Sequence, residues 1–200
     1  KANKSNKAIK YRLYPNDEQK VMFAKTFGCC RFVYNQLLAL QKQRYKDGES
    51  HLSKLKSNEF ATRTLKKDYD FLKEIDKFAV SNAVFHLADA YDRFFKKQNH
   101  FPKFKSKRKS KKSYTTNFTN NNILIGKNVI KLPKVGMVKA VIHKLPKDDW
   151  KLKSVTVSQD SVGNYFASVL FEYEQEDIPS VSKSSTNSIG LDYKSDGLYM

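Results

Sequence analysis

Hydrophobic and basic residues alternate near the start of the chain, where one Lys or Arg separates Ile9 from Tyr11 and Tyr11 from Leu13. A period of two is typical of a β-strand with one buried face. Pro15 then interrupts the alternation, because proline removes a backbone donor from the ladder. We therefore expect a strand over residues 8–14.

After this strand the hydrophobic residues recur at helical spacing. Asn16 followed by Gln19 is a variant capping box, the arrangement that opens many helices. It predicts a long helix over residues 17–46. The run Lys46-Asp47-Gly48 is typical of a helix end, since glycine readily takes the left-handed conformation found there.

Two more helices are expected before residue 100. Ser57 starts a shorter helical stretch that runs to about Lys67, and a third helix opens near Asp76 and continues to Lys97. The apolar face of the third helix comprises Val80, Val84, Leu87, Ala88, Tyr91, Phe94 and Phe95. Because the connections are short, we expect the three helices to form a small unit whose aromatic faces bury only one another.

Short β-like runs dominate beyond Asn99. They cover residues 113–118, 123–125, 129–132, 137–143, 152–158 and 165–173. Residues 126–128 and 160–164 separate consecutive runs as hairpin loops do. Even spacing of this kind indicates a small antiparallel barrel or sandwich. The fold class is therefore α+β, and the strand over residues 8–14 is a candidate to join the sheet, leaving the helices as an insertion.

A polar stretch, residues 174–187, follows the last of these runs. Next comes an apolar strand, residues 188–194, which carries one acidic residue, Asp192. The sequence stops soon afterwards at Met200. A single strand does not form a domain, so we expect this chain to belong to a longer protein.

The net charge of the chain limits the classes of function that we expect. The chain has 38 Lys and Arg against 20 Asp and Glu, a net charge of +18, and such an excess is typical of proteins that bind a polyanion, most often nucleic acid. No apolar stretch is long enough for a membrane span, and the N-terminus lacks the apolar core of a signal peptide. We therefore expect a cytoplasmic protein with no membrane partner. The adjacent Cys29 and Cys30 do not suit a disulfide with each other or a zinc site, and we expect reduced thiols within a helix.

The basic charge is concentrated in residues 96–112, which contain nine Lys or Arg and no acidic residue. Phe101, Phe104 and Tyr114 lie in or next to this segment. Lysines neutralise phosphates, and aromatic rings either stack on unpaired bases or anchor the loop. We expect nucleic-acid contact here, and the alternative is a solvated lysine-rich loop with no partner.

Asp192 also has two interpretations. An aspartate that ends a short strand often serves as a turn or cap residue. The alternative is an RNase H-like site, in which clustered carboxylates bind two Mg²⁺ ions for phosphodiester cleavage. One carboxylate does not hold two metal ions, so the chain alone does not complete such a site.

A series of short motifs resembles the N-terminal half of the TnpB family, transposon-encoded RNA-guided DNA endonucleases related to the compact type V CRISPR nucleases. The motifs follow the family's order over nearly the whole chain: Tyr11–Pro15, Arg31–Asn35, Asp76–Ala79, Phe101–Phe104, Phe118–Ile123, Lys131–Lys134 and Ile189–Asp192. Each is weak alone, and the ordered set is specific.

The resemblance implies an OB-like antiparallel wedge barrel interrupted by a three-helix recognition domain and followed by the first strand of an RNase H-like (RuvC) domain. The implied boundaries are 1–15 for the first barrel strand, 16–100 for the helical domain, 101–175 for the rest of the barrel, 176–187 for a linker and 188–200 for the start of RuvC. Asp192 would then be the first catalytic, Mg²⁺-binding carboxylate. The other carboxylates, and a zinc ribbon holding Zn²⁺, would lie beyond Met200.

The resemblance also implies guide RNA and target double-stranded DNA as partners, with a short duplex motif read before the guide pairs. The matching DNA-reading positions are Ser57, Lys77, Phe78, Ser81, Thr119 and Asn120. The implied RNA-binding residues are Lys103, Lys105, Lys107, Arg108, Lys109, Lys111 and Lys112. Lys77 and Ser81 are four residues apart on the third helix, so one face presents both. The alternative for Ser57 is a helix cap, and for Phe78 a place in the core.

Three functional hypotheses follow. The first is the RNA-guided DNA-binding portion of a Mg²⁺-dependent endonuclease. The second is a nuclease-dead relative, an RNA-guided repressor whose RuvC domain has degraded. The third is a basic RNA-binding protein in which Asp192 is incidental.

Overall fold

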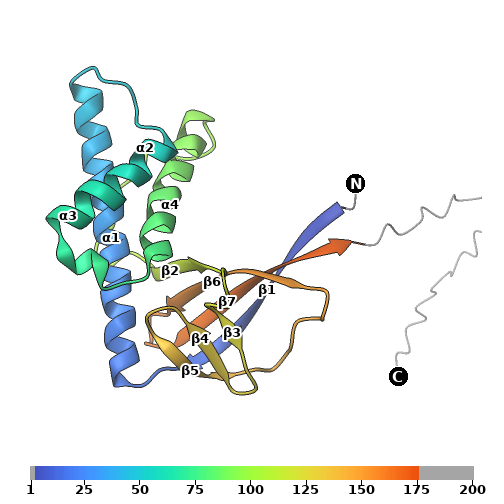
Figure 1. The fold of residues 1–200 in the computed structure, drawn as a ribbon. Coiled ribbons are helices and arrows are strands. Elements are labelled where there is room, and N and C mark those ends of the chain that lie inside the picture. The colour runs from blue at the N-terminus through green and yellow to red at the C-terminus, as the bar shows by residue number, and fades with distance from the viewer. Residues whose placement is uncertain (1–2, 176–200) are drawn as a thin grey trace, which may run out of the picture.

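The computed structural model describes residues 3–175, which form an antiparallel sheet of seven strands with helices gathered at one end (Figure 1). The α+β class is therefore confirmed. Residues 176–200, which include the expected linker, the expected RuvC strand and Asp192, lie outside the described residues.

The sheet has the order β2-β6-β7-β1-β5-β4-β3, and all of its pairs are antiparallel. The strands are β1 (Asn3–Tyr14), β2 (Lys112–Asn117), β3 (Leu124–Ile125), β4 (Val129–Leu132), β5 (Gly136–Val141), β6 (Lys151–Gln159) and β7 (Tyr165–Gln175). The sheet curls, and β2 and β3 are the edges of its described part (Figure 1). The first strand joins the sheet as expected, between β7 and β5.

Strand β1 is longer than the alternation predicted, because it begins at Asn3 and not at residue 8. Its polar first half pairs with the end of β7, where Lys4 contacts Glu172 at 3.1 Å and Ser5 Oγ donates to Gln175 Oε1 at 3.0 Å. Backbone pairing with a long partner thus extends a strand whose side chains carry no hydrophobic signal.

The long helix α1 (Asp17–Lys46) has the predicted bounds and the predicted capping box. Gln19 N donates to Asn16 Oδ1 at 2.8 Å, and Asn16 N donates to Gln19 Oε1 at 3.0 Å. The helix ends at Lys46 with Asp47 as its C-cap, and Gly48 takes a φ of 73°.

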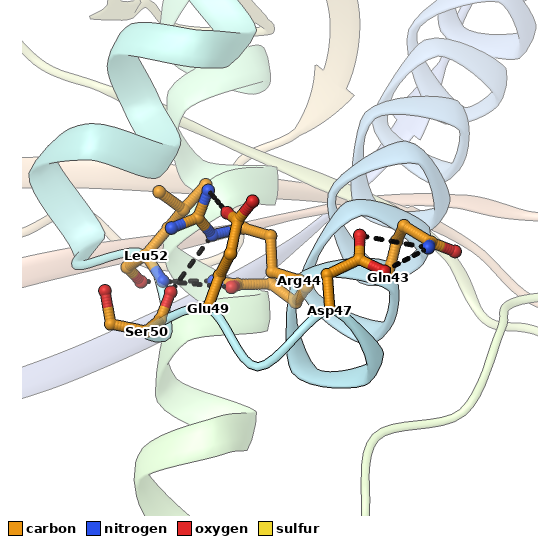
Figure 2. Close-up of polar contacts among 7 residues, drawn as sticks. Gln43, Arg44, Asp47, Glu49, Ser50 and Leu52 are labelled. Atoms are coloured by element: carbon orange, nitrogen blue, oxygen red, sulfur yellow. Dashed lines mark hydrogen bonds and ion pairs between the residues drawn. The ribbon is translucent and has the colours of Figure 1, made fainter.

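The loop that leaves α1 is tied back to the last turn of the helix. Figure 2 shows Arg44 Nε donating to Ser50 O at 3.0 Å while the guanidinium pairs with Glu49. Gln43 Nε2 donates to the Asp47 carboxylate at 3.0 Å. These contacts give the loop a defined path toward the next helix.

The second helical stretch starts earlier than predicted. Ser53, whose side chain accepts from Lys56 N, caps α2 (Lys54–Glu59), so the interpretation of Ser57 as a cap is wrong. The stretch continues as a π-helical turn (Phe60–Leu65), α3 (Lys66–Asp68) and a 3₁₀ turn (Asp70–Lys73). Helix α4 (Lys77–Phe95) then opens at Asp76, as predicted.

The helices do not bury only one another, so that expectation is wrong. Phe23 on α1 is fully buried, and its ring centroid lies 6.3 Å from that of Tyr114 on β2 and 5.5 Å from that of Tyr165 on β7. One hydrophobic core therefore extends from the helices into the inner face of the sheet. The reason is that the buried residues of α1 run from Phe23 to Gln41, and the helix begins close to the end of β1, beside the sheet.

Cys29 and Cys30 are buried free thiols on α1, as expected. Burial, followed by the neighbouring Cys29, raises the pKa of Cys30 to about 12, so the thiolate is disfavoured. None of the helices in residues 3–175 has an apolar stretch that would cross a membrane.

Gly28 provides a test of the continuous helix. It lies in the interior of α1, and a Cβ added there meets no atom within 4 Å. Gly28→Ala should raise the free energy of unfolding by about 0.5–1 kcal/mol, because alanine loses less backbone entropy in a helix. Urea denaturation measures the change.

Gly48→Ala is the matched control, because Gly48 has a positive φ that alanine does not readily adopt. It should lower the free energy of unfolding. A loss of stability in Gly28→Ala would contradict an unbroken helix.

Candidate nucleic-acid interface

The basic segment is clamped to the middle of α1 by one asparagine. Asn35 Nδ2 donates to Lys105 O at 2.9 Å, and Lys105 N donates to Asn35 Oδ1 at 2.8 Å. The neighbouring residue on α1, Tyr34, also contacts Lys105, whose ammonium lies 4.2 Å from the centroid of the Tyr34 ring. The Arg31–Asn35 motif thus fixes one point of the segment.

Aromatic contacts fix a second point. Phe101 packs edge-on against Tyr91 and Phe94 of α4, with ring centroids 5.6 and 5.2 Å apart. Phe104 remains 51% exposed and lies under Lys42, whose Nζ is 4.7 Å from the centroid of the ring. The aromatic rings of this segment were expected either to stack on bases or to anchor the loop, and the contacts of Phe101 with α4 fit the anchoring role. Tyr114 is buried in the core and does not present its ring to a base.

Between and beyond these anchors the cationic side chains reach solvent. Six of the seven RNA-binding candidates are exposed: Lys103, Lys107, Arg108, Lys109, Lys111 and Lys112. Lys105 differs, because it is half-buried and burial lowers its pKa. A turn at Ser106, which accepts from Lys109 N at 3.0 Å, carries the tip of the segment.

The structure brings the start of α4 next to the end of β2. Asn82 Nδ2 donates to Thr115 O at 2.8 Å and to Asn117 Oδ1 at 3.2 Å. The candidates Lys77 and Ser81 therefore belong to helical turns that adjoin the segment leading to Thr119.

Within this junction the candidates differ in exposure. Lys77 is exposed, and its Nζ lies 5.2 Å from the centroid of the Phe78 ring. Phe78 and Ser81 are half-buried. Phe78 is neither fully buried nor fully exposed, so a place in the core and a role in DNA reading both stay predictions for this residue.

Thr119 and Asn120 lie exposed in a tight loop after β2. Asn120 has a φ of 46°, a conformation that asparagine tolerates better than most residues. Asn122 holds the loop, because its Oδ1 accepts from Thr119 N at 2.8 Å and its Nδ2 donates to Asn117 O at 2.9 Å. Asn120 and Asn122, which shape the loop, both belong to the family motif Phe118–Ile123.

Ser57 lies apart from this junction and is only 5% exposed. It lines a small cavity with Val84 and Leu87 of α4. DNA contact at Ser57 stays a prediction, and the burial of the side chain does not favour it.

Two charged residues near the junction were not among the predicted site residues. Asp76 caps α4 by accepting from Phe78 N at 3.2 Å, and its Oδ2 is buried with no hydrogen-bond partner among the described residues. Burial lowers the pKa of Lys66, Asp76 opposes that shift and Lys77 adds to it, so these charges lie close together. The sequence signal for Asp76 was its place in a family motif, whereas Lys66 carried none.

Residues 3–175 contain no group of three His, Cys, Asp or Glu side chains arranged to hold a metal ion. Asp192 lies outside the described residues. Its role as a catalytic, Mg²⁺-binding carboxylate therefore stays a prediction from the sequence.

The clamp on the basic segment predicts a local effect of Asn35→Ala. Losing both hydrogen bonds should leave the Lys105 backbone unpaired and speed hydrogen exchange of that amide, at a cost of about 1–3 kcal/mol. Asn35→Asp, which keeps the acceptor and loses the donor, should give an intermediate rate. Gln43→Ala, on the exposed end of the same helix, is the control, and equal exchange rates in all variants would contradict the clamp.

A family profile described as a helix-turn-helix domain matches residues 5–50. In the structure this segment is most of β1 followed by the single helix α1, which runs unbroken through Gly28 to Lys46. The matched segment therefore does not contain a turn between two helices, and it offers no separate recognition helix for a DNA groove.

Proteins of known description match most of the chain. It is 30% identical over 188 residues to a "Putative RNA-guided DNA endonuclease" of Streptomyces pristinaespiralis, covering 93% of this chain and 45% of that protein. It is 29% identical over 192 residues to the "Putative RNA-guided DNA endonuclease InsQ" of Escherichia coli, covering 92% and 44%. The chain thus spans less than half the length of these two relatives.

A third relative is shorter. The "Virulence protein VsdF" of Salmonella dublin is 32% identical over 111 residues, which are 50% of this chain and 93% of that protein. Together with the seven motifs in family order and the profile match at the N-terminus, these similarities show that the chain belongs to the TnpB family.

Proposed function

We propose that this chain is the guide-RNA- and target-DNA-binding part of a Mg²⁺-dependent, RNA-guided DNA endonuclease. The observation that carries the proposal is the basic segment, residues 96–112, which is held on α1 and α4 while eight of its nine Lys and Arg side chains are exposed. The names of two relatives support the same activity.

The basic segment suits RNA because of its charge and its lack of acidic groups. Residues 96–112 contain no carboxylate, so no ion pair within the segment competes with phosphates. Contacts to phosphates supply affinity and position a strand without reading its sequence. In the proposal, Lys103, Lys107, Arg108 and Lys109 therefore hold the backbone of the guide RNA.

The α4–β2 junction suits duplex DNA. It presents a flexible cation at Lys77 and a short polar loop at Thr119 and Asn120, and these groups have the donors and acceptors that read base edges. In the proposal this junction reads the short motif beside the target, and the curled sheet corresponds to the wedge barrel of the family.

Cleavage is assigned to a RuvC site that includes Asp192. A carboxylate is a ligand type that Mg²⁺ prefers, but a single carboxylate is too few for two metal ions. The remaining carboxylates would come from a part of the protein outside this sequence. The bound metal ions would supply activated water and charge stabilisation.

The division between DNA reading and RNA holding is testable in the full-length protein. Lys77→Ala and Thr119→Ala should each weaken binding to target DNA that carries the adjacent motif by about 1–3 kcal/mol, because each removes a base contact. Affinity for the co-purified guide RNA should stay nearly unchanged. Titrations with each nucleic acid measure both constants.

Lys127→Ala is the matched control, since Lys127 is an exposed lysine in the hairpin between β3 and β4. Equal losses of RNA and DNA affinity, together with a lower melting temperature, would show that Lys77 and Thr119 support the fold and do not read DNA.

Asp192→Ala tests the nuclease assignment. In the full-length protein it should abolish Mg²⁺-dependent DNA cleavage and leave RNA-guided DNA binding almost unchanged, because guide pairing depends on other surfaces. Cleavage assays with a labelled target measure the loss. Asp196→Ala is the control from the same part of the sequence and should cleave normally.

Two results would contradict the assignment. Full cleavage by Asp192→Ala would make this residue an ordinary turn residue. Guide-dependent binding without any cleavage by the unaltered protein would instead favour the nuclease-dead repressor.

A further inference from the structure

A small cavity of about 40 Å³ lies where α1, α4, β2 and the basic segment meet. The chain supplies cations to it from separate places: Arg31 from α1, Lys105 from the clamped part of the segment, and Lys111 and Lys112 from its end. Ser110 and Ser113 add hydroxyl groups. Among the described residues, no carboxylate lines the cavity.

Among the cations that line the cavity, Lys105 has the best-defined position. Its backbone is fixed by Asn35, its ammonium lies over Tyr34, and its side chain is half-buried. In the part of the chain that the structure describes, neither Lys105 nor Arg31 forms an ion pair with a carboxylate. A partly desolvated cation without a counter-ion is unfavourable, so an anion that enters the cavity gains more here than on the open surface.

The size and chemistry of the cavity suit one phosphate. The volume accommodates several water-sized groups, which matches a compact tetrahedral anion and excludes a nucleobase. A planar guanidinium, an ammonium and hydroxyls are the donors that phosphate oxygens accept from. Two aromatic residues, Phe27 and Tyr114, line the cavity, but both are buried in the hydrophobic core and leave little ring surface for a base to stack on.

We propose that Arg31 and Lys105 bind a single backbone phosphate of a nucleic acid in this cavity, with Lys111, Lys112, Ser110 and Ser113 at its mouth. The proposal rests on the proposed function and deepens it, because it assigns one phosphate to a defined cavity. The exposed lysines of the basic segment contact phosphates only at the protein surface. Asn35 is a positioning residue, which acts by holding the Lys105 backbone.

The local electrostatics agree with an anion site. Burial lowers the pKa of Lys105, and partial desolvation followed by the Lys105 charge lowers the pKa of His86, which also lines the cavity. An anion placed among these groups favours their protonated forms. The imidazole of His86 is therefore a reporter of occupancy.

The test compares Lys105→Met with Lys127→Met in the whole chain. Methionine keeps most of the aliphatic stem and removes the charge, and Lys127 is an exposed lysine in the hairpin between β3 and β4, outside both the cavity and the basic segment. Lys105→Met should weaken binding of an oligouridine RNA or of a short DNA duplex by about tenfold or more, because a charge-assisted hydrogen bond is lost. Lys127→Met should weaken it by less than about threefold, as for a screened surface charge.

Arg31→Gln provides a second variant that does not depend on the packing of Lys105, and it should show the same loss. Lys105→Arg should restore most of the affinity. In the unaltered chain, inorganic phosphate should raise the pKa of His86 measured by NMR, and Arg31→Gln should reduce that effect.

The outcomes are separable. A loss for RNA alone assigns the phosphate to RNA, and a loss for duplex DNA alone assigns it to DNA. Equal effects of Lys105→Met and Lys127→Met, together with normal binding by Arg31→Gln, would overturn the phosphate site while leaving the proposed function intact. Failure of the unaltered chain to bind either nucleic acid would overturn both.

Discussion

Strand β1 lies in the middle of the sheet, and the later strands and the helices are built around it. This strand pairs with β7 along most of its length and with β5 at its end, so the first residues of the chain hold together strands formed much later. A central strand is buried on its inner face, and Tyr11 and Leu13 are almost completely inaccessible there. Because only Pro15 and Asn16 separate β1 from α1, the position of the strand fixes where the helix begins.

Helix α1 then connects three surfaces in succession. Its first turns bury Phe23 against the sheet, its middle turns clamp Lys105 through Asn35, and its last turns hold the following loop through Arg44 (Figure 2). Gln41 adds a further tie, since its side chain exchanges hydrogen bonds with the backbone of Leu52. A single unbroken helix is suited to this role because it fixes the spacing of all three contacts.

This arrangement also explains why the proposed nucleic-acid contacts lie at junctions. The basic segment crosses from α4 to β2 over the side of α1, and the loop at Thr119 follows the strand that Asn82 joins to α4. Loops anchored on a rigid scaffold carry many binding residues, because their backbones are held while their side chains reach solvent. The helix-turn-helix description of residues 5–50 does not account for these contacts, since that segment contributes a strand and a scaffold helix.

The local features of this protein follow from short-range patterns in its amino-acid sequence. Periodicity and capping residues predicted α1, α4 and most strand positions, because such signals depend on neighbouring residues alone. The order of short motifs identified the family, and the concentration of lysines identified the basic segment. Whether Asp192 binds a metal remains a prediction from that same evidence.

Contacts between residues far apart in the sequence could be assigned only from the folded chain. The tertiary structure extended β1 to Asn3 through pairing with β7, merged the helices with the sheet into one core, and placed Ser57 in the interior. It also separated Lys105, which the sequence grouped with its exposed neighbours, from the rest of the basic segment. The physical reason is that burial and desolvation depend on residues brought together by folding, which no local pattern of side chains encodes.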